Sequence, residues 1–249
     1  KITILNSIGN LEEARALMAS RRFHPWEGGE GKVVGQFRFC HIELAKQALL
    51  KNDAAEAIRL LQSLNTYPAN LGEGKLYQAL ENDAHYLLGI AYAELGNEQE
   101  AVRFFNAATA GSSEPVSAIY YNDPQPDQIV YQALAWLQLG EQDRANDIFK
   151  KLIAFGEQHM NDKVKIDYFA VSLPDMLVFE IDLDRRNVIH CTYMMALGYM
   201  GLDNKEKAGE LLNRILTLDN NHQGAVSFGR MLSFPDKKRV VSGASLPVS

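Results

Sequence analysis

Five short segments of similar pattern recur along the chain, and this repetition constrains the fold more than any other feature. Each segment centres on an alanine within an amphipathic run, and the spacings between successive alanines are 43, 44, 44 and 63 residues. A turn of small and polar residues precedes each segment, as "LGNEQ" precedes Ala101. A fixed period of this length predicts a stack of similar units. The anchoring alanines are Ala14, Ala57, Ala101, Ala145 and Ala208.

A second helical segment lies before each turn and is clearest in "HYLLGIAYAELG". Leu88, Gly89 and Tyr92 fall at positions 7, 8 and 11 of a helical hairpin, and Ala101 and Phe105 fall at positions 20 and 24. This pattern resembles the tetratricopeptide repeat. Small residues at positions 8 and 20 let the two helices of a hairpin approach closely, while larger residues fill the space between hairpins. The resemblance implies an all-α fold, a right-handed superhelix of helical hairpins.

The period predicts one repeat domain over residues 1–233 and a poorly ordered tail over 234–249. A unit length near 44 residues exceeds the usual ~34, so each unit carries extra residues in a long loop that joins it to the next. We call these loops joints. The predicted elements are a truncated first unit at 1–34 with a helix at 10–22, hairpins at 35–65, 77–110, 126–156 and 184–217, and a closing helix at 220–232.

Two joints share one motif, "HPWEGGEGK" ending at Lys32 and "YPANLGEGK" ending at Lys75. Proline ends the preceding helix, the glycines permit tight turns, and Glu30 and Glu73 precede a helix whose dipole favours a carboxylate. A phosphate loop needs glycine six residues before its lysine and Ser or Thr after it, and neither copy has them. The motif is therefore predicted to be a joint between hairpins.

Trp26 and Glu27 are not required by such a joint. A tryptophan beside carboxylates forms a platform for stacking a sugar face, although packing of Trp26 on the next hairpin is an alternative interpretation. A later joint, "YYNDPQPD", places two aromatic rings beside an Asn-Asp pair that could read hydroxyl groups. The candidate ligand-binding residues are Trp26, Glu27, Glu30, Lys32, Glu73, Lys75, Tyr120, Tyr121, Asn122 and Asp123.

The longest joint carries several carboxylates among apolar residues, and Asp167, Asp175 and Glu180 are its candidate catalytic residues. Glycoside hydrolysis uses a pair of carboxylates, but acidic residues on the outer face of an inserted segment are the competing interpretation. No nucleophile elbow is present, and the six histidines and two cysteines form no metal-ligand spacing. We therefore predict no metal and no cofactor, and whether the chain contributes to an enzyme stays open.

Composition restricts the partners. The net charge of -6 and the scattered Lys and Arg residues give no basic patch for nucleic acid or an anionic membrane. No apolar run approaches the ~20 residues of a membrane helix. Cys40 and Cys191 lie in apolar segments of helical pattern, which predicts free buried thiols, a reducing compartment and a cytoplasmic location.

Phrases such as "RRFHPWEGGEGKV", "YYNDPQPDQIVYQALA" and "RRNVIHCTYMMALGYMGL" resemble the C-terminal part of a family of large bacterial proteins. Members join an N-terminal β-sandwich domain, similar to domains of carbohydrate-active enzymes, to C-terminal tetratricopeptide repeats. The resemblance implies a binding or scaffold module in a carbohydrate-related system, with a protein, its own N-terminal domain or an oligosaccharide as partner. The alternative is a module whose loops complete a glycoside-processing site on that domain.

Overall fold

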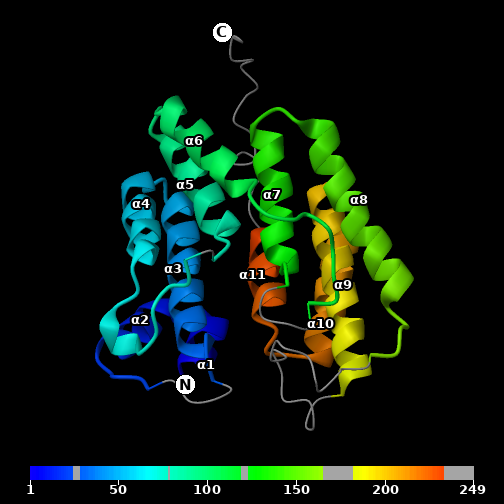
Figure 1. Ribbon diagram of the computed structural model, residues 1–249, viewed down its shortest axis with the longest axis horizontal. Coiled ribbons are helices and arrows are strands. Elements are labelled where there is room, and N and C mark those ends of the chain that lie inside the picture. The colour runs from blue at the N-terminus through cyan, green and yellow to red at the C-terminus, as the bar shows by residue number, and fades with distance from the viewer. Residues whose placement is uncertain (25–28, 78, 119–122, 165–181, 233–249) are drawn as a thin grey trace. The chain divides into compact units, whose positions relative to one another are not determined.

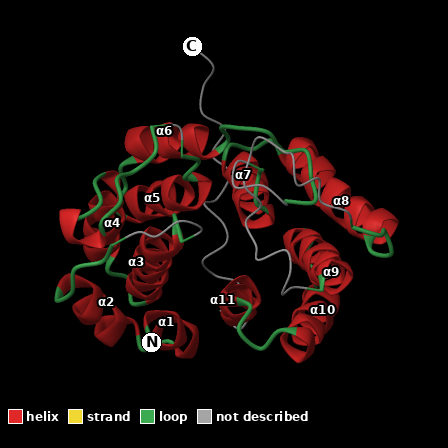
Figure 2. Ribbon diagram, turned by 60° about the horizontal axis from the view of Figure 1, so that its bottom comes forward, coloured by secondary structure: helices red, strands yellow, loops and turns green. Residues whose placement is uncertain are grey.

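The computed structural model describes residues 1–24, 29–77, 79–118, 123–164 and 182–232. Within these ranges the chain consists of helices and connecting loops, and no strand is present (Figure 2). The predicted all-α fold class is confirmed. The chain divides into two compact units, unit 1 over Lys1–Ala108 and unit 2 from Thr109 onward, and each is described separately.

Among its described residues, unit 1 contains three pairs of neighbouring helices and two short 3-10 turns (Figure 1). Its elements are α1 (Ile2–Ile8), α2 (Leu11–Ala19), α3 (Lys32–Leu50), α4 (Ala54–Gln62), η1 (Ser63–Asn65), η2 (Ala69–Leu71), α5 (Asn82–Glu94) and α6 (Glu98–Ala108). The described part of unit 2 contains two further pairs, and a single helix follows them. Its elements are α7 (Pro126–Gln138), α8 (Gln142–His159), α9 (Leu183–Gly201), α10 (Lys205–Leu218) and α11 (Gln223–Leu232).

The five hairpins share one turn geometry. A residue with left-handed backbone lies five positions before each anchoring alanine, and its N–H donates to the carbonyl three residues back. The next N–H donates to the carbonyl five residues back, at 2.8–2.9 Å in all five turns. These two bonds define a Schellman motif, which satisfies the last carbonyls of the first helix. The left-handed residues are Gly9, Asn52, Gly96, Gly140 and Asp203.

The anchoring alanines lie in the first turn of the second helix of each hairpin. In every hairpin the alanine N–H donates to the carbonyl of the residue four positions earlier, the N-cap of that helix. None of the five alanines exposes more than 3% of its surface. A larger side chain there would push the two helices apart, so the repeated alanine follows from close packing.

The left-handed position gives a test of the shared turn. Gly96 has φ of 73°, and an added side-chain carbon there would have no atom within 4 Å, so Gly96→Ala adds backbone strain alone. We expect it to lower the free energy of unfolding by about 1 kcal/mol. Asp203→Gly, at φ of 61°, should raise it by a similar amount. Urea unfolding followed by circular dichroism measures both changes in the free energy of unfolding. Changes of the same sign in the two variants would contradict a shared left-handed turn position.

Glycines also set the distance between helices. A side-chain carbon at Gly89 of α5 would lie 2.5 Å from the Phe105 ring of α6. At Gly156 of α8 it would lie 2.6 Å from the Cys191 carbonyl of α9, and at Gly198 of α9 it would lie 2.6 Å from the Phe149 carbonyl of α8. The longest joint separates α8 and α9 in sequence, yet their backbones approach through this reciprocal pair of glycines.

The first hairpin contains a helix that the sequence pattern did not predict. The repeat indicated a helix at 10–22, which corresponds to α2, whereas α1 precedes it. The segment "ITILNSI" is rich in β-branched residues, which disfavour helix in isolation. Its buried face, with Leu5 and Asn6, packs on α2 and α3, and tertiary contact outweighs the local preference.

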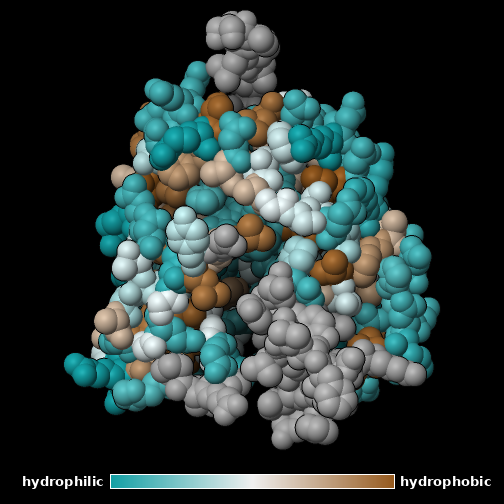
Figure 3. All heavy atoms as spheres, viewed as in Figure 1, coloured by the Kyte–Doolittle hydropathy of each residue, from teal (hydrophilic) through white to brown (hydrophobic). Residues whose placement is uncertain are grey.

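Polar side chains cover most of the described surface on the face shown in Figure 3, where apolar side chains form only small groups. No helix among the described residues combines the length and apolar character needed to cross a membrane.

Candidate functional site

In unit 1 the two joints with the shared motif contact each other. The Phe23 N–H donates to the Asn70 carbonyl at 2.8 Å, and the Asn70 side chain donates to the carbonyls of Met18 and Arg21 at 2.8 and 2.7 Å. Asn70 therefore satisfies carbonyls at and beyond the end of α2. It occupies the motif position that Glu27 holds in the first copy. Through Asn70, the second joint therefore stabilises the chain that leads from α2 into the first joint.

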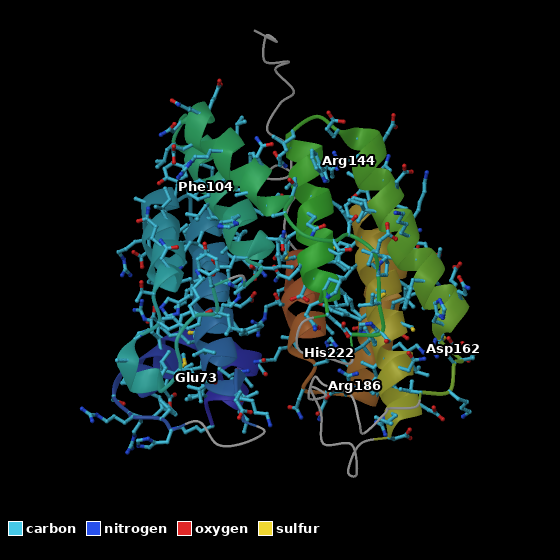
Figure 4. All side chains as sticks on the ribbon, in the orientation of Figure 1. Glu73, Phe104, Arg144, Asp162, Arg186 and His222 are labelled. Atoms are coloured by element: carbon cyan, nitrogen blue, oxygen red, sulfur yellow. The ribbon has the colours of Figure 1, made fainter. Side chains whose placement is uncertain are left out.

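The carboxylate of Glu73 and the ammonium of Lys75 also have partners within unit 1. Glu73 lies near the end of unit 1 that contains α2 (Figure 4), and its Oε1 accepts a hydrogen bond of 2.7 Å from the Gly31 N–H, at the start of α3. The Lys75 Nζ donates to the Leu64 carbonyl at 3.2 Å and to Glu81 Oε2 at 2.6 Å. Both contacts tie a joint to the neighbouring elements.

An ion-pair network continues from Lys75 into the interior of unit 1. Glu81 Oε1 accepts from Arg38 of α3 at 3.1 Å, and the same guanidinium pairs with Asp83 of α5. These three side chains expose 10–18% of their surface, so the charges are partly shielded from water. The network holds the joint after α4 against α3 and α5. Because its charges already satisfy one another, it has the character of a structural element.

Apart from Asp123, the other predicted site residues are either exposed or outside the described residues. Glu30 and Lys32 are exposed at the start of α3. Trp26 and Glu27 lie outside the described residues, as do Tyr120, Tyr121, Asn122, Asp167, Asp175 and Glu180 of unit 2.

In unit 2 the joint before α7 is held by hydrogen bonds from side chains of α7 and α9 to its backbone carbonyls. Gln132 of α7 donates to the carbonyls of Ala110 and Ser112 at 2.9 and 3.2 Å. His190 Nε2 lies 2.8 Å from the Val116 carbonyl, and Arg186 donates to the Ala118 carbonyl at 3.0 Å. Arg186 and His190 are one turn apart on α9, so one face of α9 holds the joint.

A cavity of about 740 Å³ lies beside this face, within the range of small-ligand pockets. Its walls come from the start of α7, the first three turns of α9, and the segment between α10 and α11. The helices α7 and α9 are each the first helix of a hairpin, and α11 follows the last hairpin. Figure 4 shows Arg186 and His222 near each other in this part of unit 2. The lining residues are Gln125, Pro126, Asp127, Asp182, Arg185, Arg186, Ile189, His190, Tyr193, Leu218, Asp219, His222 and Gly224.

The two histidines of the cavity are neutral at neutral pH. Burial lowers the pKa of His190 to about 4, and the positive charge of Arg186 acts in the same direction. Burial also lowers the pKa of His222, against the opposing effect of the Asp219 carboxylate. His190 is within electrostatic range of Arg186, His222 and the predicted ligand residue Asp123. Among the predicted candidates in the described part of unit 2, Asp123 is thus close to a lining residue of the cavity.

Three charged side chains of the cavity form hydrogen bonds with backbone groups at or near helix ends. Asp182 is the N-cap of α9, and its Oδ1 accepts from the Arg185 N–H at 3.0 Å. The Arg185 guanidinium donates to the Leu218 carbonyl, at the end of α10. Asp219 Oδ1 accepts from the Asn221 N–H at 2.9 Å. The wall therefore carries both donors and acceptors whose side chains are held by hydrogen bonds to the backbone, and such groups can orient a polar ligand.

Sequence reasoning did not single out this wall, although a signal was present. Arg186, His190 and Tyr193 lie at i, i+4 and i+7 of the predicted helix, which places them on one face. The segments that complete the cavity lie near positions 125 and 220, so their proximity depends on the tertiary fold.

The cysteines and metal-ligating residues give no reactive centre among the described residues. Burial raises the pKa of Cys40 to about 12 and that of Cys191 to about 11, so both are thiols at neutral pH. No group of three or more His, Cys, Asp or Glu side chains in the described part of the chain is arranged to hold a metal ion.

Comparison with known proteins identifies one of the hairpins. Residues 83–110, which span most of α5 and all of α6, match the family model described as tetratricopeptide repeat. This segment is a tetratricopeptide repeat. The four other hairpins share the turn and the buried alanine of this repeat.

Two solved structures are similar to the chain over much of its length. One is titled "MamA RS-1 ArsTM double mutant", with 17% sequence identity and a TM-score of 0.27, covering 76% of this chain and 77% of that one. The other is titled "Crystal structure of YrrB: a TPR protein with an unusual peptide-binding site". It has 14% identity and a TM-score of 0.26, covering 78% of this chain and 92% of that one.

Proposed function

We propose that the chain is a helical-repeat binding module and that the cavity of unit 2 receives a segment of a protein partner. The observation that carries this proposal is the position of the cavity, along the first helices of successive hairpins and α11. A tetratricopeptide repeat within the same chain supports a role in protein binding.

The chemistry of the wall favours an extended peptide. A peptide main chain offers both carbonyl acceptors and N–H donors, and the wall carries both arginine donors and aspartate acceptors. Tyr193 and Ile189 supply apolar surface for side chains. Charges of both signs on the wall would select a peptide with a mixed charge pattern.

A peptide-display experiment with the whole chain tests this proposal. Peptides selected on the immobilised wild-type chain are measured by calorimetry against Arg185→Ala and against Arg144→Ala as a matched control. Arg144 lies in the same unit, away from the cavity, and its guanidinium packs on the Trp136 ring at 3.7 Å (Figure 4). We expect Arg185→Ala to weaken binding about tenfold or more and Arg144→Ala to leave it unchanged. Equal binding by both variants would show that the peptide binds elsewhere.

The carbohydrate-related context rests on the resemblance to large bacterial proteins. It is tested in the same binding assay with two other kinds of ligand. A recombinant N-terminal β-sandwich domain of such a protein and a panel of oligosaccharides replace the selected peptides. Trp26→Ala and a Tyr120→Ala/Tyr121→Ala variant probe the joints with these ligands. Loss of binding in either variant would support the joint residues as ligand contacts, and unchanged binding would remove them from the proposal.

A further inference from the structure

The first turn of α11 is closed by a histidine. The His222 carbonyl accepts the first intrahelical bond, from the Val226 N–H at 3.1 Å. Its ring Nδ1 accepts from the Ala225 N–H at 3.0 Å. This is the geometry of an N-cap, a position usually held by Ser, Thr, Asp or Asn. In α11 the capping acceptor is a titratable nitrogen.

The cap fixes the protonation state of the ring. A ring nitrogen that accepts a hydrogen bond carries no proton, so His222 is neutral and its proton is on Nε2. The ring is also held by packing, because it meets the Tyr193 ring of α9 edge-on with centroids 4.7 Å apart. Gly224 allows this contact, since a side-chain carbon there would lie 3.3 Å from His222 Cε1 and would collide with the Tyr193 ring.

We propose that His222 is a proton-operated cap that holds the α11 wall of the cavity when neutral and releases it when protonated. A protonated ring carries N–H groups on both nitrogens, so the bond to the Ala225 N–H is lost and donor faces donor. The added positive charge also lies at the N-terminal end of a helix, where the dipole disfavours it.

The groups that face His222 act in opposite directions. Asp219, three residues earlier, favours the protonated form. On α9, Arg185 and Arg186 line the same cavity and disfavour a further positive charge, and His190 acts likewise when it is protonated. Tyr193 contributes an apolar ring, and Asp127 of α7 also lines the cavity. Burial of the ring outweighs Asp219 and keeps the cap closed at neutral pH.

Release of the first turn would alter the cavity because two of its lining residues, His222 and Gly224, belong to this turn. The rest of α11 is anchored by Phe228, which is 2% exposed, and α11 packs on α9 and α10. The release is therefore local, a fraying of the helix start. It depends on the chain's own geometry and is independent of the proposed function.

Hydrogen exchange of the whole chain tests this cap. Protection of residues 223–232, corrected for the intrinsic exchange rate, is compared at about pH 7.5 and about pH 5. In the wild type we expect protection in the first turn of α11 to fall about fivefold at the lower pH, which corresponds to loss of one cap. The α6 peptide, in unit 1, serves as the internal reference for global loosening.

His222→Asn is the decisive variant, because asparagine caps a helix and does not titrate. It should keep α11 protected at both pH values, and His222→Ala should expose the first turn at both. His190→Gln should leave the α11 response of the wild type in place. The proposal is overturned if wild-type α11 keeps its protection at the lower pH relative to α6, or if His222→Asn loses protection as the wild type does.

Discussion

Gly156→Ala is expected to lower the free energy of unfolding by about 2 kcal/mol, the net of an overpacking cost and a gain in helix propensity. The added carbon would lie 2.5 Å from Met195 Cγ and 2.6 Å from the Cys191 carbonyl oxygen. A side chain can rotate away, but a carbonyl within a helix cannot move without shifting α9. Gly198→Ala meets the Phe149 carbonyl in the same way and should show a similar loss.

Gly209→Ala is the matched control for these two variants. Gly209 lies within α10 and has no atom within 4 Å of an added side-chain carbon. This variant gains only helix propensity and should raise the free energy of unfolding by up to about 1 kcal/mol. Chemical denaturation of the three variants measures the comparison. A stabilising effect of alanine at Gly156 would contradict the close approach of α8 and α9.

Acid is expected to destabilise the chain through His190, which burial keeps neutral. Its pKa is lowered from 6.5 to about 4 in the folded chain. Between these values the unfolded chain binds the proton and the folded chain does not. Stability from this group is therefore complete above pH 6.5, falls with decreasing pH and is fully lost near pH 4. A shift of this size corresponds to about 3 kcal/mol.

His190→Gln measures this contribution, because glutamine does not titrate. Unfolding free energies of wild type and variant, taken by urea denaturation from about pH 7.5 to about pH 4, should converge as the pH falls, since only the wild type loses the His190 contribution. The other buried histidines, His41, His85 and His222, also have lowered pKa values, so part of the acid dependence should remain in the variant. Arg144→Ala removes no group that titrates in this range and should run parallel to the wild type. If the unfolding free energies of His190→Gln and wild type depended on pH in the same way, His190 would not be the source of the acid destabilisation.

The sequence predicted the hairpins because their signals are local. The anchoring alanines and the polar turns before them lie within a few residues of each other. Two of the left-handed turn positions hold Asn52 and Asp203 in place of glycine, so a search for glycine alone would have missed them. The helix α1 was missed because "ITILNSI" prefers an extended chain and is made helical by tertiary packing.

The candidate site was less predictable because its contacts join distant positions. Glu73 was predicted as a ligand residue from its motif, but its partner is the Gly31 N–H, 42 residues away. Lys75 likewise has its partners in Leu64 and Glu81. The cavity of unit 2 brings together α7, α9 and the start of α11, and among the predicted residues that the structure describes Asp123 is within electrostatic range of the lining residue His190. Helical periodicity gives the face of one helix, whereas the apposition of faces requires the fold.

The shared turn of the five hairpins has a consequence for how the chain folds. Each turn is closed by bonds that span at most five residues, so a hairpin can form before any distant contact is made. Chains dominated by such short-range contacts fold fast and can nucleate at several places, since little loop entropy is lost at each step. The reciprocal glycines of α8 and α9 are different, because their contact closes the longest joint. Docking of α9 on α8 is therefore expected to be a late step, following the formation of the individual hairpins.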